Sequence, residues 1–284
     1  MPLPVAIVIF PQVKLLDVTG PLQVFNDACH PDSDRAAYAP ALYSLTGGPI
    51  PTDSPVPLDS RPLSTLDGAN TDTLLVAGGL GTRAAVRDAA LIAAIARAAR
   101  GARRLGSICT GSFLLAAAGL LDGRQATTHW ESCARMQRSF PRVDVEEDPI
   151  YVRDGHVWTS AGVTAGIDMA LAMVAEDLGR PAAMELARSL VTFMMRPGGQ
   201  SQFSNLLQQQ TSDARGRFDD LHDWIRDNLD GDLRVEMLAE RMHMSLRSFN
   251  RIYRQTTGQT PAKAVEVQRV EAARRLLTES ERSI

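Results

Sequence analysis

Three short stretches rich in apolar residues constrain the fold of the first part of the chain most strongly. They are VAIVIF at 5–10, DTLLVAGG at 72–79 and RRLGSI at 103–108. Stretches of this kind are typical of strands that are buried on both faces of a parallel sheet. The residues between the second and the third stretch, 82–101, have helical periodicity and end at Gly101. Strands that alternate with helices predict an α/β sheet with crossover connections.

Residues 149–161 predict an antiparallel addition to this sheet. Two β-rich runs flank the pair Asp154-Gly155, which suits a type I′ hairpin turn. We therefore expect a hairpin on a mainly parallel sheet. The next stretch, 163–179, has helical periodicity, and Gly179 marks the end of the predicted helix.

The pattern changes at residues 196–216, which are rich in Gly, Gln and Ser and predict a linker. This linker divides a first domain at 1–195 from a region at 217–284 in which every apolar pattern is helical. We expect two domains, an α/β domain followed by a small all-α domain.

The overall composition excludes several classes of protein. The net charge of −3 over 284 residues is too small to indicate a partner. The chain shows no basic signal-peptide region and no apolar run near the ~20 residues that span a bilayer. The cysteines are few, odd in number and without metal-ligand spacing (Cys29, Cys109 and Cys133). We expect a cytoplasmic protein without a disulfide framework, metal site, cofactor or membrane partner.

The helical region contains two helices joined by a tight turn, at 235–242 and from residue 246 onward, as in a helix-turn-helix. Ser245 is placed to cap the second helix. Arginine and asparagine bond to guanine and adenine edges, and further cations neutralise phosphates. We therefore predict that this region binds double-stranded DNA through the side chains of Arg247, Ser248, Asn250, Arg251, Arg254 and Lys263.

The local charge favours this prediction. Residues 241–263 contain five cations and no Asp or Glu: Arg241, Arg247, Arg251, Arg254 and Lys263. A local charge of +5 in a chain of net charge −3 suits an electrostatic footprint on DNA. The alternative is a solvated helical bundle whose arginines merely face water.

The stretches SLRSFNRIYRQTTGQTP (245–261) and VQRVEAARRLL (267–277) resemble the first helix-turn-helix and the linker helix of AraC-type transcription regulators. The resemblance covers roughly residues 217–284. Regulators of this type normally carry a second helix-turn-helix after the linker helix, at the point where this sequence reaches Ser283-Ile284. The resemblance therefore implies half of a DNA-binding unit, truncated after the linker helix.

Cys109 follows the third apolar stretch in the pattern S-x-C-x-G at 107–111. Small residues around the cysteine permit the sharp strand-to-helix turn of a nucleophile elbow. A helix that begins at Thr110 is expected to lower the pKa of the thiol and to favour the thiolate. The backbone N–H groups of Gly78 and Gly79 offer a candidate oxyanion site. The alternative is that Cys109 is one of many buried free cysteines.

Four stretches resemble the ThiJ/PfpI superfamily, whose members are flavodoxin-like proteins with an elbow cysteine and an acidic residue facing it. They are LLDVTGPLQVF (15–25), VAGGLGT (76–82), SICTGSFLLAAAGLLDGRQATTHW (107–130) and SAGVTAGIDMAL (160–171). The resemblance spans nearly all of residues 3–195. It implies a flavodoxin-like domain with a mainly parallel sheet.

Within this superfamily the chain is most similar to isocyanide hydratase. The similarity implies that Cys109 is a nucleophile, that Thr110 stands beside it, and that Asp17 is a general acid or base. A carboxyl beside a thiolate is expected to have a raised pKa because of the like charge, which suits proton transfer. Two other chemistries fit less well, because the protease branch has His at position 110 and the HWE motif at 129–131 follows the elbow too soon for an amidotransferase. We therefore expect His129 to be structural or pocket-lining.

Together the two halves resemble GlxA-like regulators, in which a ThiJ/PfpI domain is joined to an AraC-type domain, and RPGGQSQFS (196–204) resembles their connecting segment. The resemblance implies a DNA-binding transcription factor that forms a homodimer through its first domain and senses a small, nitrogenous metabolite. The predicted pocket is formed by Asp17, Gly78, Gly79, Cys109, Thr110 and His129. One alternative is a cysteine-dependent hydro-lyase that uses Asp17, Cys109 and Thr110. Another makes Cys109 a redox sensor that is oxidised because it is thiolate-like and accessible.

Overall fold

The computed structural model describes residues 1–279 apart from 32, 34, 67–70, 195–198 and 201–217. Two compact units, Met1–Gln200 and Ser201–Ile284, make up the chain. Of the predicted linker at 196–216, only residues 199 and 200 are described, and the last five residues of the chain lie outside the described part.

The first unit is built on a sheet that, within the described residues, has eight strands in the order β3-β4-β2-β1-β5-β6-β10-β9. All neighbouring strands are parallel except for two pairs at the edges, β3 with β4 and β9 with β10. The predicted mainly parallel sheet is confirmed. The strand bounds are β1 (Leu3–Val8), β2 (Tyr38–Ser44), β3 (Gly48–Ile50), β4 (Leu58–Pro62), β5 (Thr73–Val76), β6 (Arg104–Ile108), β9 (Tyr151–Asp154) and β10 (Val157–Ser160).

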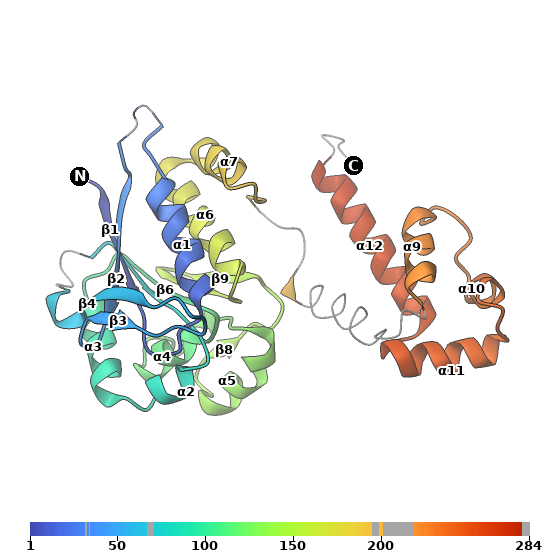
Figure 1. Ribbon diagram of the computed structural model, residues 1–284, viewed down its shortest axis with the longest axis horizontal. Coiled ribbons are helices and arrows are strands. Elements are labelled where there is room, and N and C mark those ends of the chain that lie inside the picture. Colours follow the sequence, from blue (N-terminus) through green and yellow to red (C-terminus); the bar gives the residue numbers. More distant parts are fainter. Residues whose placement is uncertain (32, 34, 67–70, 195–198, 201–217, 280–284) are drawn as a thin grey trace. The chain divides into compact units, whose positions relative to one another are not determined.

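Helices cover both faces of this sheet (Figure 1). One face carries α1 (Leu15–Asp27), α6 (Ala165–Leu178) and α7 (Arg180–Ser189). The other carries α2 (Thr82–Ala85), α3 (Ala89–Ala99) and α4 (Ser112–Ala117). A smaller part consists of α5 (Cys133–Ser139) and the parallel pair β7 (Gln125–Ala126) and β8 (Asp144–Val145). Short 3-10 turns lie at η1 (Leu63–Thr65), η3 (Cys109–Gly111) and η4 (Trp130–Ser132).

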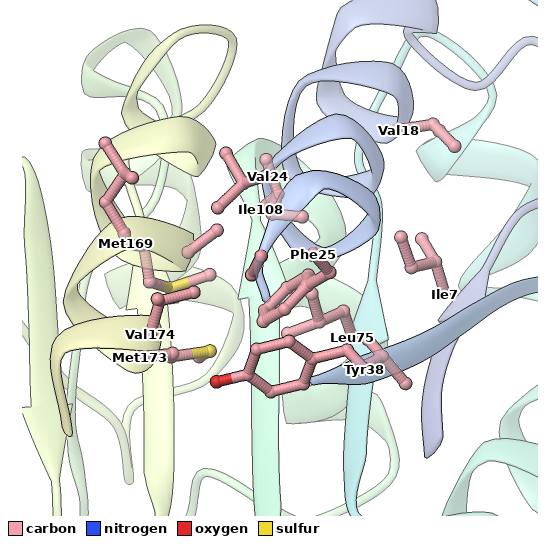
Figure 2. Close-up of a cluster of buried hydrophobic side chains, with 14 of the residues drawn as sticks. Ile7, Val18, Val24, Phe25, Tyr38, Leu75, Ile108, Met169, Met173 and Val174 are labelled. Carbon is pink, nitrogen blue, oxygen red and sulfur yellow. The ribbon is translucent and has the colours of Figure 1, made fainter. Parts of the chain in front are cut away.

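The central strands are apolar because both of their faces are covered. Val5 and Ile7 of β1 pack on the side of α1 and α6, whereas Ala6 and Val8 pack on the opposite side. Figure 2 shows the first of these clusters, in which Phe25 of α1 and side chains of α6 lie over the sheet. Alternate strand residues point to opposite faces, so an uninterrupted apolar stretch is what a doubly covered strand requires.

The helical stretch 82–101 is broken into two helices, contrary to the single periodic helix that the sequence indicates. The side chain of Asp88 accepts hydrogen bonds from the backbone nitrogens of Ala90 and Leu91, at 3.0 and 3.1 Å. Aspartate is a strong N-cap because its oxygen satisfies amides of the first helical turn that have no intrahelical partner. Asp88 therefore begins a new helix, α3, where apolar periodicity alone shows no boundary.

The predicted hairpin is present, but its turn lies one residue later than expected. Asp154 pairs with Val157, so the two turn residues are Gly155 and His156. Gly155 has φ +62°, whereas His156 is not among the residues with positive φ. That pattern belongs to a type II′ turn, which needs glycine at its first central position, rather than to a type I′ turn.

Gln200 is attached to the first unit although it belongs to the predicted linker. Its side chain is buried, and its amide nitrogen lies 3.0–3.1 Å from four oxygens. Three are backbone carbonyl oxygens, of Thr128, Glu147 and Pro149, and the fourth is the hydroxyl of Thr127. The backbone nitrogen of Gln200 also donates to the carbonyl of Asp148, at 2.6 Å.

Replacing Gln200 with leucine is expected to lower the free energy of unfolding of the first unit by about 1–2 kcal/mol. Leucine has a similar volume but removes the buried amide donor that these four oxygens share. The measurement is urea unfolding followed by tryptophan fluorescence. Gln23→Leu is the control, since Gln23 is exposed on α1, and its change should stay within about 0.5 kcal/mol. Equal effects of the two substitutions would show that the hydrogen bonds of Gln200 do not stabilise the unit.

The second unit is helical throughout its described part: α9 (Asp219–Asp227), α10 (Val235–Arg241), α11 (Leu246–Thr257) and α12 (Pro261–Glu279). These helices share an apolar core centred on Phe218, Phe249 and Tyr253, all fully buried. The hydroxyl of Tyr253 is hydrogen-bonded to the imidazole of His222 at 2.8 Å. Within the portion that the structure describes, no helix is long and apolar enough to cross a membrane.

Candidate functional site

The elbow at Cys109 is a tight turn under backbone strain. Strand β6 ends at Ile108, Cys109 has φ +56°, and α4 begins at Ser112, two residues later than the sequence suggests. Gly162 faces the cysteine, and a Cβ atom built on it would lie 2.5 Å from the Cβ of Cys109. Positive φ is rare for residues other than glycine and is concentrated at functional sites. The turn therefore exists because small neighbours leave room for it.

Asp17, in the first turn of α1, is fully buried and close enough to Cys109 to influence its pKa. Its Oδ1 accepts a hydrogen bond from the backbone nitrogen of Val163 at 2.8 Å, while its Oδ2 has no hydrogen-bond partner among the described residues. Burial raises the pKa of Asp17 to about 6, although the hydrogen bond from Val163 and the neighbouring thiol of Cys109 oppose the rise. The raised pKa thus comes from desolvation and not from the like charge of a thiolate.

The expected low pKa of Cys109 is wrong. Burial raises the pKa of the thiol far above its usual range, and the negative charge of Asp17 raises it further. The backbone N–H and the hydroxyl of Thr110 favour the thiolate but offset only part of this rise. At neutral pH the thiol therefore stays protonated, because desolvation outweighs the backbone dipole of one short turn.

The side chain of Thr110 accepts the hydrogen bond of the Gly79 backbone N–H, which is one of the two donors that the sequence predicts for an oxyanion site. The backbone nitrogen of Gly79 donates to the hydroxyl oxygen of Thr110 at 3.0 Å, and that oxygen lies 2.8 Å from the hydroxyl of Thr82. Gly78 packs against the elbow, where an added Cβ would lie 2.6 Å from the backbone nitrogen of Thr110. A substrate oxygen would have to displace Thr110 to reach the Gly79 N–H.

A cavity of about 730 Å³ opens beside the elbow. Four of the six predicted pocket residues line it: Gly79, Cys109, Thr110 and His129. Asp17 and Gly78 do not line it, and both are buried. The wall also contains four cations that sequence analysis missed: Lys14, Arg83, Arg135 and Arg138. No sequence motif predicts this group. Lys14 directly precedes α1, Arg83 lies on α2, and Arg135 and Arg138 lie on α5, so the four side chains come together only in the folded chain.

His129 is a wall residue, as expected. Its Nδ1 lies 3.9 Å from the carboxylate of Glu131, and burial lowers its pKa. The preceding residue, Thr128, donates its hydroxyl to the carbonyl oxygen of Cys109 at 3.0 Å. Among the described residues, no group of three or more His, Cys, Asp or Glu side chains could hold a metal ion.

The second candidate site is the outward face of α11. Ser245 caps this helix, as predicted, by accepting a hydrogen bond from the backbone nitrogen of Ser248 at 3.3 Å. Phe249 and Tyr253 are buried in the core of the unit. The opposite face is open, because the side chains of the predicted arginines are all exposed: Arg247, Arg251 and Arg254.

The other predicted DNA contacts are partly engaged within the unit. The side-chain amide of Asn250 donates to the carbonyl of Leu246 at 3.0 Å, and the hydroxyl of Ser248 is bonded to that of Ser245 at 2.9 Å. Lys263 on α12 is paired with Glu266 at 2.9 Å. In contrast, Arg247 and Arg254 form no ion pair with any residue that the structure describes. The guanidinium of Arg251 donates to the side-chain oxygen of Gln255 at 3.3 Å, so Arg247 and Arg254 are the least engaged of the predicted DNA contacts.

Comparison with known proteins assigns both units. Residues 4–176 match the DJ-1/PfpI family, and residues 238–284 match a helix-turn-helix domain. The chain is 30% identical over 280 residues to the HTH-type transcriptional regulator CdhR of Pseudomonas aeruginosa, covering 97% of this chain and 79% of that protein. It is 35% identical over 180 residues to an isonitrile hydratase of Pseudomonas putida, covering 63% and 74%. A crystal structure of a ThiJ/PfpI family protein from Pseudomonas syringae aligns with a TM-score of 0.61 and 29% identity, covering 69% and 78%.

The chain belongs to the DJ-1/PfpI family. More particularly, it belongs with the transcriptional regulators that join this domain to an AraC-type helix-turn-helix, because its likeness to such a regulator extends over both units. The likeness to the hydratase extends over less of the chain. The predicted fold class and the predicted type of regulator are confirmed, while the fold itself is shared with enzymes.

Proposed function

We propose that the chain is a DNA-binding transcriptional regulator whose first unit binds a small effector and carries out no catalysis. One observation carries the proposal: α11 presents three exposed arginines on the face opposite its buried aromatic side chains. A helix of this kind at the second position of a helix-turn-helix enters the major groove, where arginine bonds bidentately to guanine.

We propose further that the regulator is a homodimer that assembles through its first unit. Half-sites on DNA are spaced about one helical turn apart, so two recognition helices must be held at a matching distance. An effector in the cavity beside Cys109 would then act by changing the placement of the two helices. A DNA target also implies that the protein works in the bacterial cytoplasm.

A second candidate function, hydration of an isonitrile, is favoured by one observation. The thiol of Cys109 and the carboxylate of Asp17 are close enough to shift each other's pKa, and the pKa of Asp17, about 6, suits proton transfer near neutral pH. Two features oppose it, namely the protonated thiol and the engagement of the Gly79 N–H with Thr110. The redox alternative is weakened as well, because a sensor cysteine needs an accessible thiolate and Cys109 is buried and protonated.

The test combines turnover and DNA binding. Purified full chain is incubated with an aliphatic isonitrile, and the N-alkylformamide formed by its hydration is measured by chromatography, with Cys109→Ala as the background. In parallel, binding to the promoter fragment next to the coding gene is measured by fluorescence anisotropy. We expect no N-alkylformamide above the background and sequence-dependent binding of the fragment. Production of N-alkylformamide that Cys109→Ala abolishes, together with no binding of DNA, would reverse the assignment.

A further inference from the structure

The cavity beside Cys109 has more cations than anions on its wall. Its cations are Lys14, Arg83, Arg135 and Arg138, and its acids are Asp53 and Glu131. Lys14 and Asp53 neutralise each other, since the Nζ of Lys14 lies 3.1 Å from a carboxylate oxygen of Asp53. Glu131 lies near His129, with 3.9 Å between its carboxylate and Nδ1. None of the three arginines forms an ion pair with a residue in the described part of the chain.

Arg135, on α5, is held in a position that lacks a counter-charge. Its guanidinium lies 4.5 Å from the centre of the Phe113 ring, and its Nη2 donates to the hydroxyl of Ser132 at 3.4 Å. Its Nε is buried and has no hydrogen-bond partner among the described residues. Burial and the nearby positive charge of Arg83 both lower the pKa of Arg135. A partly desolvated cation beside a second cation is unfavourable unless an anion joins them.

An apolar recess adjoins this pair of arginines. It has a volume of about 340 Å³ and shares Thr82, Arg83 and Arg135 with the main cavity. The rest of its wall consists of the apolar side chains Val86, Phe113 and Phe140, together with Arg87 and Ser139. The two arginines therefore lie where the polar space beside the elbow meets an apolar space. Such a boundary selects a ligand with one charged end and one hydrocarbon part.

We propose that Arg83 and Arg135 bind an anionic oxygen group of the effector, a carboxylate or a phosphate, while an apolar part of the effector lies against Val86, Phe113 and Phe140. The proposal rests on the proposed function only in that the first unit binds an effector. A nitrogenous effector is compatible with it, provided that the molecule also carries an acidic group. A simple cationic amine is not, because three unpaired arginines would repel it.

The test is calorimetric titration of the full chain at low salt with three probes: hexanoate, its uncharged analogue hexanamide, and inorganic phosphate. We expect hexanoate to bind at least about tenfold more tightly than hexanamide, because hydrogen bonds to ionised groups are stronger than neutral ones. Arginine-dependent binding of phosphate without binding of hexanoate would support the anion site and assign it to phosphate. Equal binding of hexanoate and hexanamide, or binding of none of the probes, would overturn the proposal.

Variants locate the site. Arg83→Gln combined with Arg135→Gln should weaken anion binding by about tenfold or more, whereas Arg188→Gln, an exposed control on α7, should leave it unchanged. Circular dichroism checks that each variant is folded. Equal loss in the two cases would mean that general charge, and not this arginine pair, attracts the anion. If the unaltered chain binds hexanoate through these arginines but binds no DNA, the proposed function fails and this inference stands.

Discussion

Replacing Arg247 and Arg251 together with alanine is expected to weaken binding of the full chain to its DNA target by about a hundredfold or more. Both side chains are exposed on α11, and neither is needed for the core that Phe249 and Tyr253 form. A bidentate arginine contact to a base contributes about 1–3 kcal/mol, and about 1.4 kcal/mol corresponds to a tenfold change in affinity. The loss should therefore come from missing contacts and not from unfolding.

The measurement is fluorescence anisotropy with the target duplex and with a scrambled duplex, at several salt concentrations. If the arginines contact bases, binding to the target falls far more than binding to the scrambled duplex. If they contact phosphates, both fall and the salt dependence becomes shallower. Arg226→Ala is the matched control, since Arg226 is an exposed cation on α9 that is paired with Asp223. Unchanged binding by the double variant would show that α11 is not the recognition helix.

Replacing Asp17 with asparagine is expected to stabilise the protein at pH 7.5, by about 2–3 kcal/mol. The folded pKa of about 6 lies above the ordinary value of 3.8, so folding favours the protonated carboxyl. The stability that this group contributes is complete below pH 3.8 and is lost as the pH rises through 6. At pH 7.5 the ionised carboxylate therefore lowers the free energy of unfolding. Asparagine removes this charge, and the Oδ1 of asparagine can still accept the hydrogen bond from Val163.

The pH dependence separates this effect from a general change in packing. Urea unfolding at pH 7.5 and at pH 5 should show the advantage of Asp17→Asn falling to about half, because the native carboxyl is mostly protonated at the lower pH. Asp59→Asn, at an exposed position on β4, is the control for the loss of a surface carboxylate. A variant that is less stable than the parent at pH 7.5 would mean that Asp17 is well solvated or paired.

Much of the fold follows from the sequence because burial on both faces imposes a simple pattern. The apolar stretches at 5–10, 72–79 and 103–108 became β1, β5 and β6, each within a few residues. The break between α2 and α3 at Asp88 could not be predicted from the apolar periodicity, because a single side-chain cap can outweigh periodicity over a short stretch. The hairpin turn moved by one residue because only Gly155 takes a positive φ without cost.

The sequence indicated the residues around the elbow better than it indicated their protonation states. Motifs brought together Asp17, Cys109 and Thr110, but the protonation state of the thiol depends on how deeply the elbow is buried. No sequence pattern reports that depth. The arginines of the cavity wall could not be predicted for a related reason. Arg83 and Arg135 lie on separate helices that come together only in the folded chain. In contrast, the face of α11 could be predicted because one helix carries both its buried and its exposed side chains.

Selection of duplexes from a random pool tests most directly whether one chain of this kind joins effector binding to recognition of DNA. The full chain is immobilised, bound duplexes are amplified over several rounds, and the rounds are run with and without the effector that calorimetry identifies. We expect a recurring sequence motif, repeated at about one helical turn, whose enrichment changes when the effector is present. A bound pool that stays random in both conditions would contradict the assignment of this protein as a regulator.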